Sequence, residues 1–115
     1  MANAEECRSA LEQLSRNLAR STGDVRKAAA LDRSLTCRIT DLDLTFSGRL
    51  RDGRIEGVAE APGPPAAKAE IRLTMSSDDL VALVDGRLNF ASAWATGRVR
   101  LEAGFRDLLR LRTLL

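Results

Sequence analysis

The chain has 115 residues, which is the length of one domain, and 44% of them are apolar. It contains no histidine and no tyrosine, and only three phenylalanines and one tryptophan. The lack of histidine excludes imidazole general bases, Ser–His and Cys–His nucleophile pairs, and histidine-ligated metals. A formal net charge of +2 argues against a dedicated nucleic-acid-binding protein. We therefore expect a single domain over residues 1–115 with no catalytic residues, no metal, no cofactor and no nucleic-acid partner.

Cysteine usage and hydropathy indicate the compartment. Cys7 and Cys37 form no CxxC pair, and both fall on apolar faces of the expected elements, so we interpret them as small core residues. The first twelve residues carry three acids and no apolar run, so we expect no secretory signal. No stretch approaches the ~18 consecutive apolar residues of a membrane span. These features predict a soluble, cytoplasmic protein.

The first expected element is an amphipathic helix over residues 3–20. Its apolar residues recur at helical spacing, with charged residues on the opposite side. Asn3 is suited to cap its N-terminus, and Glu6 follows three residues later. Residues 24–33 have weak helical character, and we expect a turn or a short helix there.

A period of two residues begins at Leu35 and predicts strands over residues 35–40 and 42–50. The dipeptide Asp52-Gly53 then favours a type I′ hairpin, because both central residues of that turn need a positive φ. A turn of this type fixes the register of the two strands that it joins.

The predicted hairpin register carries a structural hypothesis. Next to the turn it places Leu50 opposite Ile55 and Arg49 opposite Glu56. Further along, it places small residues on the apolar face of the hairpin: Gly48 opposite Gly57, Ala59 opposite Phe46, and Ala61 opposite Leu44. Such a layer leaves room for an apolar guest, lets a helix pack closely, or lets the sheet bend. The residues alone favour the two structural explanations.

The second half of the chain predicts a strand over residues 69–75 followed by two helices. Ser76 and Asp79 form a capping box for the first helix, which closes at Gly86, and Asn89 caps the second. A last strand and a C-terminal helix follow. The hairpin makes the sheet at least partly antiparallel, so the order of elements predicts an α+β fold with helices covering one face.

A cluster of arginines lies near the C-terminus. Residues 98–112 contain five arginines against Glu102 and Asp107, which gives a net charge of five minus two, or +3. We favour a solvated face as the explanation. The alternative is a weak attraction to anionic lipid headgroups or phosphate.

One stretch, residues 69–111, carries a longer pattern. It begins with an alternating strand, which is followed by a helix with an acidic start, many leucines and a glycine at its end. An L-N-x-x-x-A segment and an aromatic residue come next. A G-x-V-x-L strand and a final Leu-rich helix complete the pattern. The positions that match this pattern are Leu80, Leu83, Gly86, Leu88, Asn89, Ala93, Trp94, Gly97, Val99 and Leu101. The pattern resembles the sterol carrier protein type 2 family, in its small bacterial-type single-domain form. The upstream helix, hairpin and strand also fit, so the resemblance extends over about the whole chain.

The resemblance implies an α+β domain with a mostly antiparallel, about five-stranded sheet and helices that cover one face and enclose an apolar tunnel. It implies a non-enzymatic protein that binds and carries a lipid-like ligand: a fatty acid, an acyl chain, or a sterol-like or polycyclic molecule. The residues that it places along the tunnel are Phe46, Leu50, Ile55, Leu73, Leu80, Leu83, Val84, Phe90, Trp94, Leu101, Phe105, Leu108 and Leu109. As further partners we expect at most a transient membrane-surface contact, and the protein is a monomer or a homodimer.

Two other functions fit the same fold. One is a protein-interaction or homodimerisation module with a filled core, and the other is an accessory subunit that presents a bound substrate to a partner enzyme. The sequence ends in Arg-Thr-Leu-Leu and not in a Ser-Lys-Leu type signal, so we do not expect peroxisomal delivery.

Overall fold

The computed structural model describes residues 2–20 and 32–111, and the side chains of residues 18, 19, 110 and 111 are not part of the description. The elements are α1 (Ala4–Arg20), β1 (Arg33–Ile39), β2 (Leu44–Arg51), β3 (Arg54–Pro62), β4 (Ile71–Met75), α3 (Ser77–Asp85), α4 (Phe90–Ala95), β5 (Arg100–Ala103) and α5 (Phe105–Leu111). The predicted α+β class is confirmed. The turn or short helix expected over residues 24–33 lies outside the described residues as far as residue 31.

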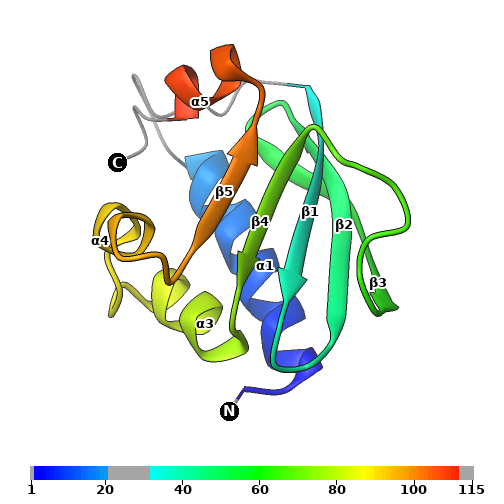
Figure 1. Ribbon diagram of the computed structural model, residues 1–115, viewed down its shortest axis with the longest axis vertical. Helices are drawn as coiled ribbons and strands as arrows, with labels where there is room; N and C mark the ends of the chain where they lie inside the picture. The colour runs from blue at the N-terminus through cyan, green and yellow to red at the C-terminus, as the bar shows by residue number, and fades with distance from the viewer. Residues whose placement is uncertain (1, 21–31, 112–115) are drawn as a thin grey trace.

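The five strands form one mixed sheet in the order β3-β2-β1-β4-β5. β1 and β4 pair in parallel, whereas the other neighbouring strands pair antiparallel. The parallel pair arises because a loop after β3 carries the chain back to the starting end of β1 (Figure 1). Figure 1 also shows α1 crossing one face of the sheet, with α3 and α4 beside it and α5 beyond the end of β5.

The helix ends follow the capping signals in the sequence. The Glu6 backbone N–H donates to Asn3 Oδ1 at 2.8 Å, and the Asn3 N–H donates to the Glu6 carboxylate at 3.2 Å. The Asp79 backbone N–H donates to Ser76 Oγ at 3.2 Å at the start of α3. Gly86 ends α3 with a φ of 80°, the left-handed conformation in which glycine avoids a steric cost. Each signal acts within one helical turn, so sequence alone identifies it.

The Asp52-Gly53 turn is the predicted hairpin turn. Both residues have positive φ, 52° and 73°, as a type I′ turn requires. The first rungs follow the predicted register, with Leu50 paired with Ile55. The local chemistry of the turn therefore determines the beginning of the ladder.

A β-bulge changes the pairing further along the hairpin. Gly57 has a φ of 63°, and the register shifts there by one residue. The predicted pairs beyond this point are wrong. The observed partners are Glu60 for Phe46, Ala59 for Ser47, and Ala61 for Thr45. The small residues of β3 therefore do not line up on the apolar face.

Gly48 lies where the bulge brings β2 and β3 close together. A Cβ atom at this position would be 2.9 Å from the Glu56 carbonyl oxygen and within 3.6 Å of the Ile55 and Val58 side chains. These two side chains occupy the space that the glycine leaves. The glycine permits a close approach of two strands and creates no hollow.

Polar contacts attach α1 to the edge strand β3. The Ile55 backbone N–H donates to Ser15 Oγ at 2.9 Å. Arg8 forms an ion pair with Glu60 at 3.6 Å, and its guanidinium carbon lies 5.8 Å from the centre of the Phe46 ring. These contacts hold α1 over the β2–β3 side of the sheet.

The buried apolar residues form two clusters. The larger one lies beneath the first half of α1 and contains Cys7, Ala10, Leu11, Cys37, Ile39, Phe46, Met75, Leu80, Ala93 and Val99. The smaller one contains Leu35, Leu50 and Ile71. Since Leu35 stands near the start of β1 and Ile39 at its end, the clusters occupy opposite ends of the covered face.

The two cysteines are free and belong to the larger cluster. Burial, together with nearby carboxylates, raises the pKa of the Cys7 thiol to about 11. Burial raises the pKa of the Cys37 thiol to about 12. Thiols that stay protonated are poor nucleophiles, so both cysteines act as the core residues that the sequence predicted.

Asp41 ties the β1–β2 turn to the start of α3. Its carboxylate accepts the Ser77 backbone N–H at 2.8 Å and the Ser77 hydroxyl at 2.6 Å. Partial burial raises the pKa of Asp41, but the hydrogen bonds from Ser77 outweigh this effect and hold the pKa below its usual value. The charged form of Asp41 therefore stabilises the fold.

We expect Gly48→Ala to lower the free energy of unfolding by about 1–3 kcal/mol, the usual cost of overpacking. The added methyl group would meet the Glu56 carbonyl oxygen, so one strand must shift. Chemical denaturation measures the loss. Ser47→Ala, at the exposed neighbouring position, is the control and should change stability by less than about 0.5 kcal/mol. An unchanged midpoint for Gly48→Ala would show that the strands do not approach so closely.

We expect Asp41→Asn to destabilise the protein more at neutral than at acidic pH. A carboxyl group with a depressed pKa in the folded state contributes stability above its unfolded pKa of about 3.9, and this contribution disappears as pH falls through the folded pKa. Denaturation of the native chain and the variant at about pH 7 and about pH 3 measures the difference. A difference of the same size at both pH values would contradict the role of the charge.

Candidate functional site: an apolar cavity

A cavity of about 360 Å³ lies between α1, the covered face of the sheet and α3. All five strands contribute to it, and α5 is the one described element that does not. Its lining consists of Leu11, Leu14, Asn17, Leu35, Leu50, Ile55, Ile71, Leu73, Met75, Leu80, Leu83, Val84, Leu88, Phe90 and Leu101. The volume falls near the lower end of small-molecule sites, which occupy about 300–1,000 Å³.

The inward positions of α1 account for the place of the cavity. Cys7 and Ala10 are small and buried against the larger core cluster. One turn further along the helix, Leu11 and Leu14 line the cavity, and Asn17 follows on the same side. The polar side chain of Asn17 is not suited to fill an apolar space. The cavity therefore stays open toward the second half of α1.

Eight of the thirteen residues that the family resemblance suggested lie around this cavity. They are Leu50, Ile55, Leu73, Leu80, Leu83, Val84, Phe90 and Leu101. They come from four strands and two helices, and the fold brings their side chains to one space. That they bind a ligand stays a prediction.

Three of the four suggested aromatic residues do not line the cavity, and two of them are Phe46 and Trp94. Phe46 is buried in the larger core cluster, at 2% exposure, and faces Arg8. Trp94 packs against Phe90 with 6.3 Å between the ring centres, but Phe90 alone of the pair lines the cavity. Trp94 is therefore behind Phe90 and does not line the cavity itself.

The suggested residues of α5 do not reach the cavity either. Phe105 and Leu109 are exposed, and Leu108 is partly buried without lining the cavity. The reason is the rotation of the helix, because α5 turns Asp107 toward the body of the protein to pair with Arg33 at 2.9 Å. The apolar pattern of residues 105–111 does not indicate that Asp107 pairs with Arg33 on β1.

Seven lining residues were missed in the sequence analysis: Leu11, Leu14, Asn17, Leu35, Ile71, Met75 and Leu88. Helical periodicity in α1 and alternation in β1 and β4 identify most of these as inward-facing positions. The missing information was tertiary, because the parallel pairing of β1 with β4 and the placement of α1 opposite them have no local signal.

The lining contains no charged side chain, and Asn17 is its one polar residue within the described part of the chain. Asn17 is exposed at the rim, where Gln13 Nε2 donates to its Oδ1 at 2.8 Å. No described lining residue is an acid, a base or a nucleophile, so the site is suited to hold apolar surface away from water and not to transfer protons. Over residues 2–20 and 32–111, no three His, Cys, Asp or Glu residues are grouped to hold a metal ion.

The described structure is a small α+β domain with an uncharged apolar cavity, the kind of site in which proteins hold apolar small molecules. Residues 11–115 match the model of the SCP-2 sterol transfer family, and the chain belongs to that family. This match confirms the resemblance recognised in the sequence. The general function of the family is lipid binding or transfer.

Solved structures of several proteins share the fold. The crystal structure of sterol carrier protein 2 is 22% identical, covers 88% of this chain and 82% of that one, and has a TM-score of 0.62. The sterol carrier protein domain 2 of Helicoverpa armigera is 15% identical, with 98% and 89% covered and a TM-score of 0.67. The UbiJ-SCP2 ubiquinone synthesis protein is 13% identical, with 99% and 92% covered and a TM-score of 0.57. No curated protein matches the chain.

We expect Val84→Phe to stabilise the ligand-free protein by about 0.5–2 kcal/mol, because the larger side chain fills part of the cavity. Thermal or chemical denaturation measures the gain. Val81→Phe is the matched control on the same helix. Val81 packs against the core and does not line the cavity, so the added volume should cost stability. Equal losses for both variants would show that no usable space lies beside Val84.

Proposed function

We propose that this protein binds a lipid-like ligand in the cavity and carries it, without catalysing a reaction. The observation that supports the proposal most is the 360 Å³ cavity whose described lining has no charged side chain. An unfilled cavity lowers stability in proportion to its size. Because the fold retains this destabilising space between its two core clusters, a binding function for the cavity is favoured.

The ligand that we propose is a fatty acid, an acyl chain, or a sterol-like or polycyclic molecule. Each buried methylene contributes about 0.8 kcal/mol, and partial burial of about ten gives binding in the micromolar range once the cost of association is subtracted. Because the lining is uncharged, we place the carboxylate of a fatty acid at the rim beside Asn17 and its chain inside.

A second candidate function is the presentation of a bound intermediate to a partner enzyme. The likeness to the UbiJ-SCP2 protein, whose name assigns it to ubiquinone synthesis, favours this possibility. The apolar part of the intermediate would occupy the same cavity. The other alternative, an interaction module with a filled core, is disfavoured by the open space beneath α1. In either role we propose a single cytoplasmic domain that is monomeric or homodimeric.

Native mass spectrometry after gentle purification, followed by titration with a fluorescent fatty acid, tests the proposed function. We expect saturable binding of one ligand per chain in the micromolar range, read through energy transfer from Trp94, which packs on the lining residue Phe90. Val84→Phe should weaken this binding at least tenfold. Leu109→Phe, an exposed position off the cavity, is the control and should bind as the native chain does.

The absence of both a co-purified ligand and saturable binding would overturn the proposed function. Equal binding by the native chain and Val84→Phe would place the ligand outside the cavity.

A further inference from the structure

A chain of three hydrogen-bonding side chains on α1 ends at the cavity. Arg16 Nη2 donates to Gln13 Oε1 at 2.9 Å, and Gln13 Nε2 donates to Asn17 Oδ1 at 2.8 Å. The residues are three and four positions apart, the spacing at which side chains meet on a helix surface. Of the three, Asn17 alone lines the cavity. The chain therefore runs from a cation on the surface to the one polar residue of the described lining.

Arg16 fixes the direction of both hydrogen bonds. A guanidinium has N–H donors and no acceptor, so Gln13 must present its amide oxygen to Arg16. The amide nitrogen of Gln13 is thereby turned toward Asn17, which must offer its own oxygen in return. The Asn17 Nδ2 group is left over, and within residues 2–20 and 32–111 no group accepts a hydrogen bond from it. At the rim of the cavity Asn17 is thus a donor and not an acceptor.

The charge of Arg16 strengthens this donor. A hydrogen bond from a charged group is stronger than one between neutral groups, and each bond in a chain polarises the next. Arg16 forms no ion pair with a carboxylate in the part of the chain that the structure describes, so its charge acts on Gln13 without a competing partner. The N–H groups of Asn17 are therefore better donors than those of an isolated amide.

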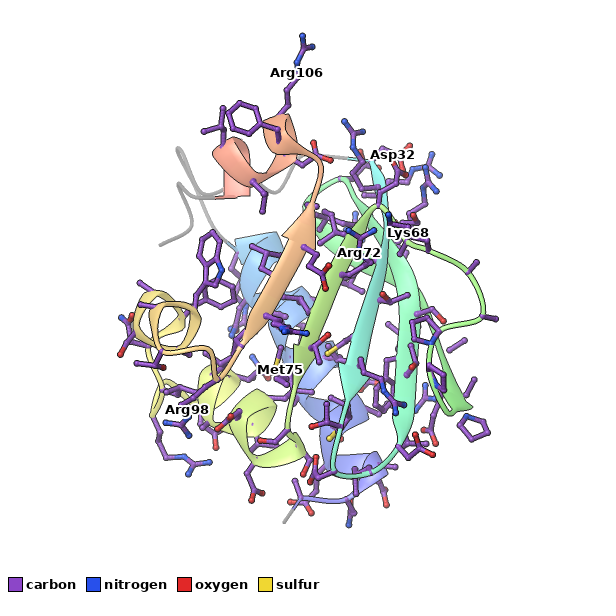
Figure 2. The ribbon with its side chains drawn as sticks, viewed as in Figure 1. Asp32, Lys68, Arg72, Met75, Arg98 and Arg106 are labelled. Carbon is purple, nitrogen blue, oxygen red and sulfur yellow. The ribbon has the colours of Figure 1, made fainter. Side chains whose placement is uncertain are left out.

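The remaining wall offers a ligand no comparable polar group. The other described lining residues are aliphatic side chains, Met75 and Phe90. Polar residues on the strands alternate with lining residues and point the other way. Arg72, for example, stands between the lining residues Ile71 and Leu73, and Figure 2 shows it on the face of the sheet that is turned away from α1. A guest in the cavity therefore meets one polar side chain of the described lining, the Asn17 amide.

We propose that Asn17 is a specificity-determining residue that selects apolar molecules with a carbonyl oxygen at one end, as in an ester, a ketone or a carboxylate. Such an oxygen accepts the hydrogen bond that Asn17 Nδ2 has to give. A protonated amine would set donor against donor and leave both groups unpaired. Gln13 and Arg16 are positioning residues, because they act on the ligand through Asn17. This inference rests on the proposed carrier function and narrows its class of ligand.

Displacement of the fluorescent fatty acid by methyl dodecanoate and by dodecylamine tests the selection, since the two ligands share a chain and differ in the head. The readout is the ratio of their affinities in each variant relative to the native chain, because the charge of the amine weakens its binding to any apolar site. Asn17→Leu should weaken the ester by about threefold to tenfold, the value of one hydrogen bond, and leave the amine almost unchanged. Asn17→Asp, which presents an acceptor, should weaken the ester and strengthen the amine.

The same substitution at the start of α1 is the control. Asn3→Asp keeps the oxygen that accepts the Glu6 backbone N–H and lies about 21 Å from Asn17 along the helix axis, at about 1.5 Å per residue. Its ratio should equal that of the native chain.

Arg16→Gln tests the chain of hydrogen bonds, because without the cation the Gln13 amide is free to turn. We expect the preference for the ester to fall at least twofold. Arg100→Gln removes the same charge from β5, where Arg100 is exposed beside the lining residue Leu101, and should leave the ratio unchanged. In NMR spectra of the native chain, the side-chain amide signals of Asn17 should shift when the ester binds, and shift much less with the amine.

A ratio that is the same in the native chain, Asn17→Leu and Asn17→Asp would overturn the proposal and leave the carrier function intact, since both ligands still bind. An unchanged ratio in Arg16→Gln would overturn the part assigned to the chain of hydrogen bonds. If neither ligand nor the fluorescent fatty acid binds the native chain, the carrier function itself is refuted.

Discussion

The placement of α1 over the sheet is the constraint on which the cavity depends. Its first half packs directly on the sheet, because the inward residues Cys7 and Ala10 are small and fully accommodated in the larger core cluster. Its second half is held by a hydrogen bond between Ser15 and the backbone of Ile55 on the edge strand. A polar bond to an edge strand sets the position of the helix without filling the space behind it. The gap beneath Leu14 persists for this reason.

The two core clusters contribute differently to the stability of the fold and to the cavity. The larger cluster contains the most deeply buried side chains, among them Ile39 and Leu80, and supports the α1–α3 end of the fold. Asp41 strengthens the same end by holding the start of α3. At the other end the smaller cluster leaves apolar surface uncovered, and this surface forms much of the cavity wall. A guest in the cavity would join the two clusters into one continuous core.

The parts of the fold that the sequence predicted are those governed by neighbouring residues. The Asn3–Glu6 capping box, the Ser76 cap and the Asp52-Gly53 turn each act within a few residues, and all three are confirmed. The predicted pairing beyond Gly57 was wrong because this residue adopts the left-handed conformation and shifts the ladder by one residue. A glycine within a strand pattern permits such a bulge but does not by itself predict the shift. The room for a guest that opposing small residues would leave in the hairpin is therefore absent, as the preference for a structural explanation implied, and the cavity has large aliphatic walls instead.

The same limit explains the candidate site. Alternation and helical spacing identify which side of each element is apolar, and this was enough for the residues of α3 and the central strands. It was not enough for α5, whose rotation depends on Arg33, a residue 74 positions earlier in the chain. It was also not enough for α1, since the choice of the strands beneath a helix is a property of the whole fold.

The proposed carrier function requires that the space between α1 and the sheet admits an apolar guest. The most direct measurement is methyl NMR of the labelled protein with a bound fatty acid. We expect nuclear Overhauser effects between the acyl chain and the methyl groups of Leu14, Leu73 and Leu83, which line the cavity from α1, β4 and α3. Effects confined to the methyl groups of Leu109, or none at all in a saturated sample, would show that the cavity is not where the ligand lies.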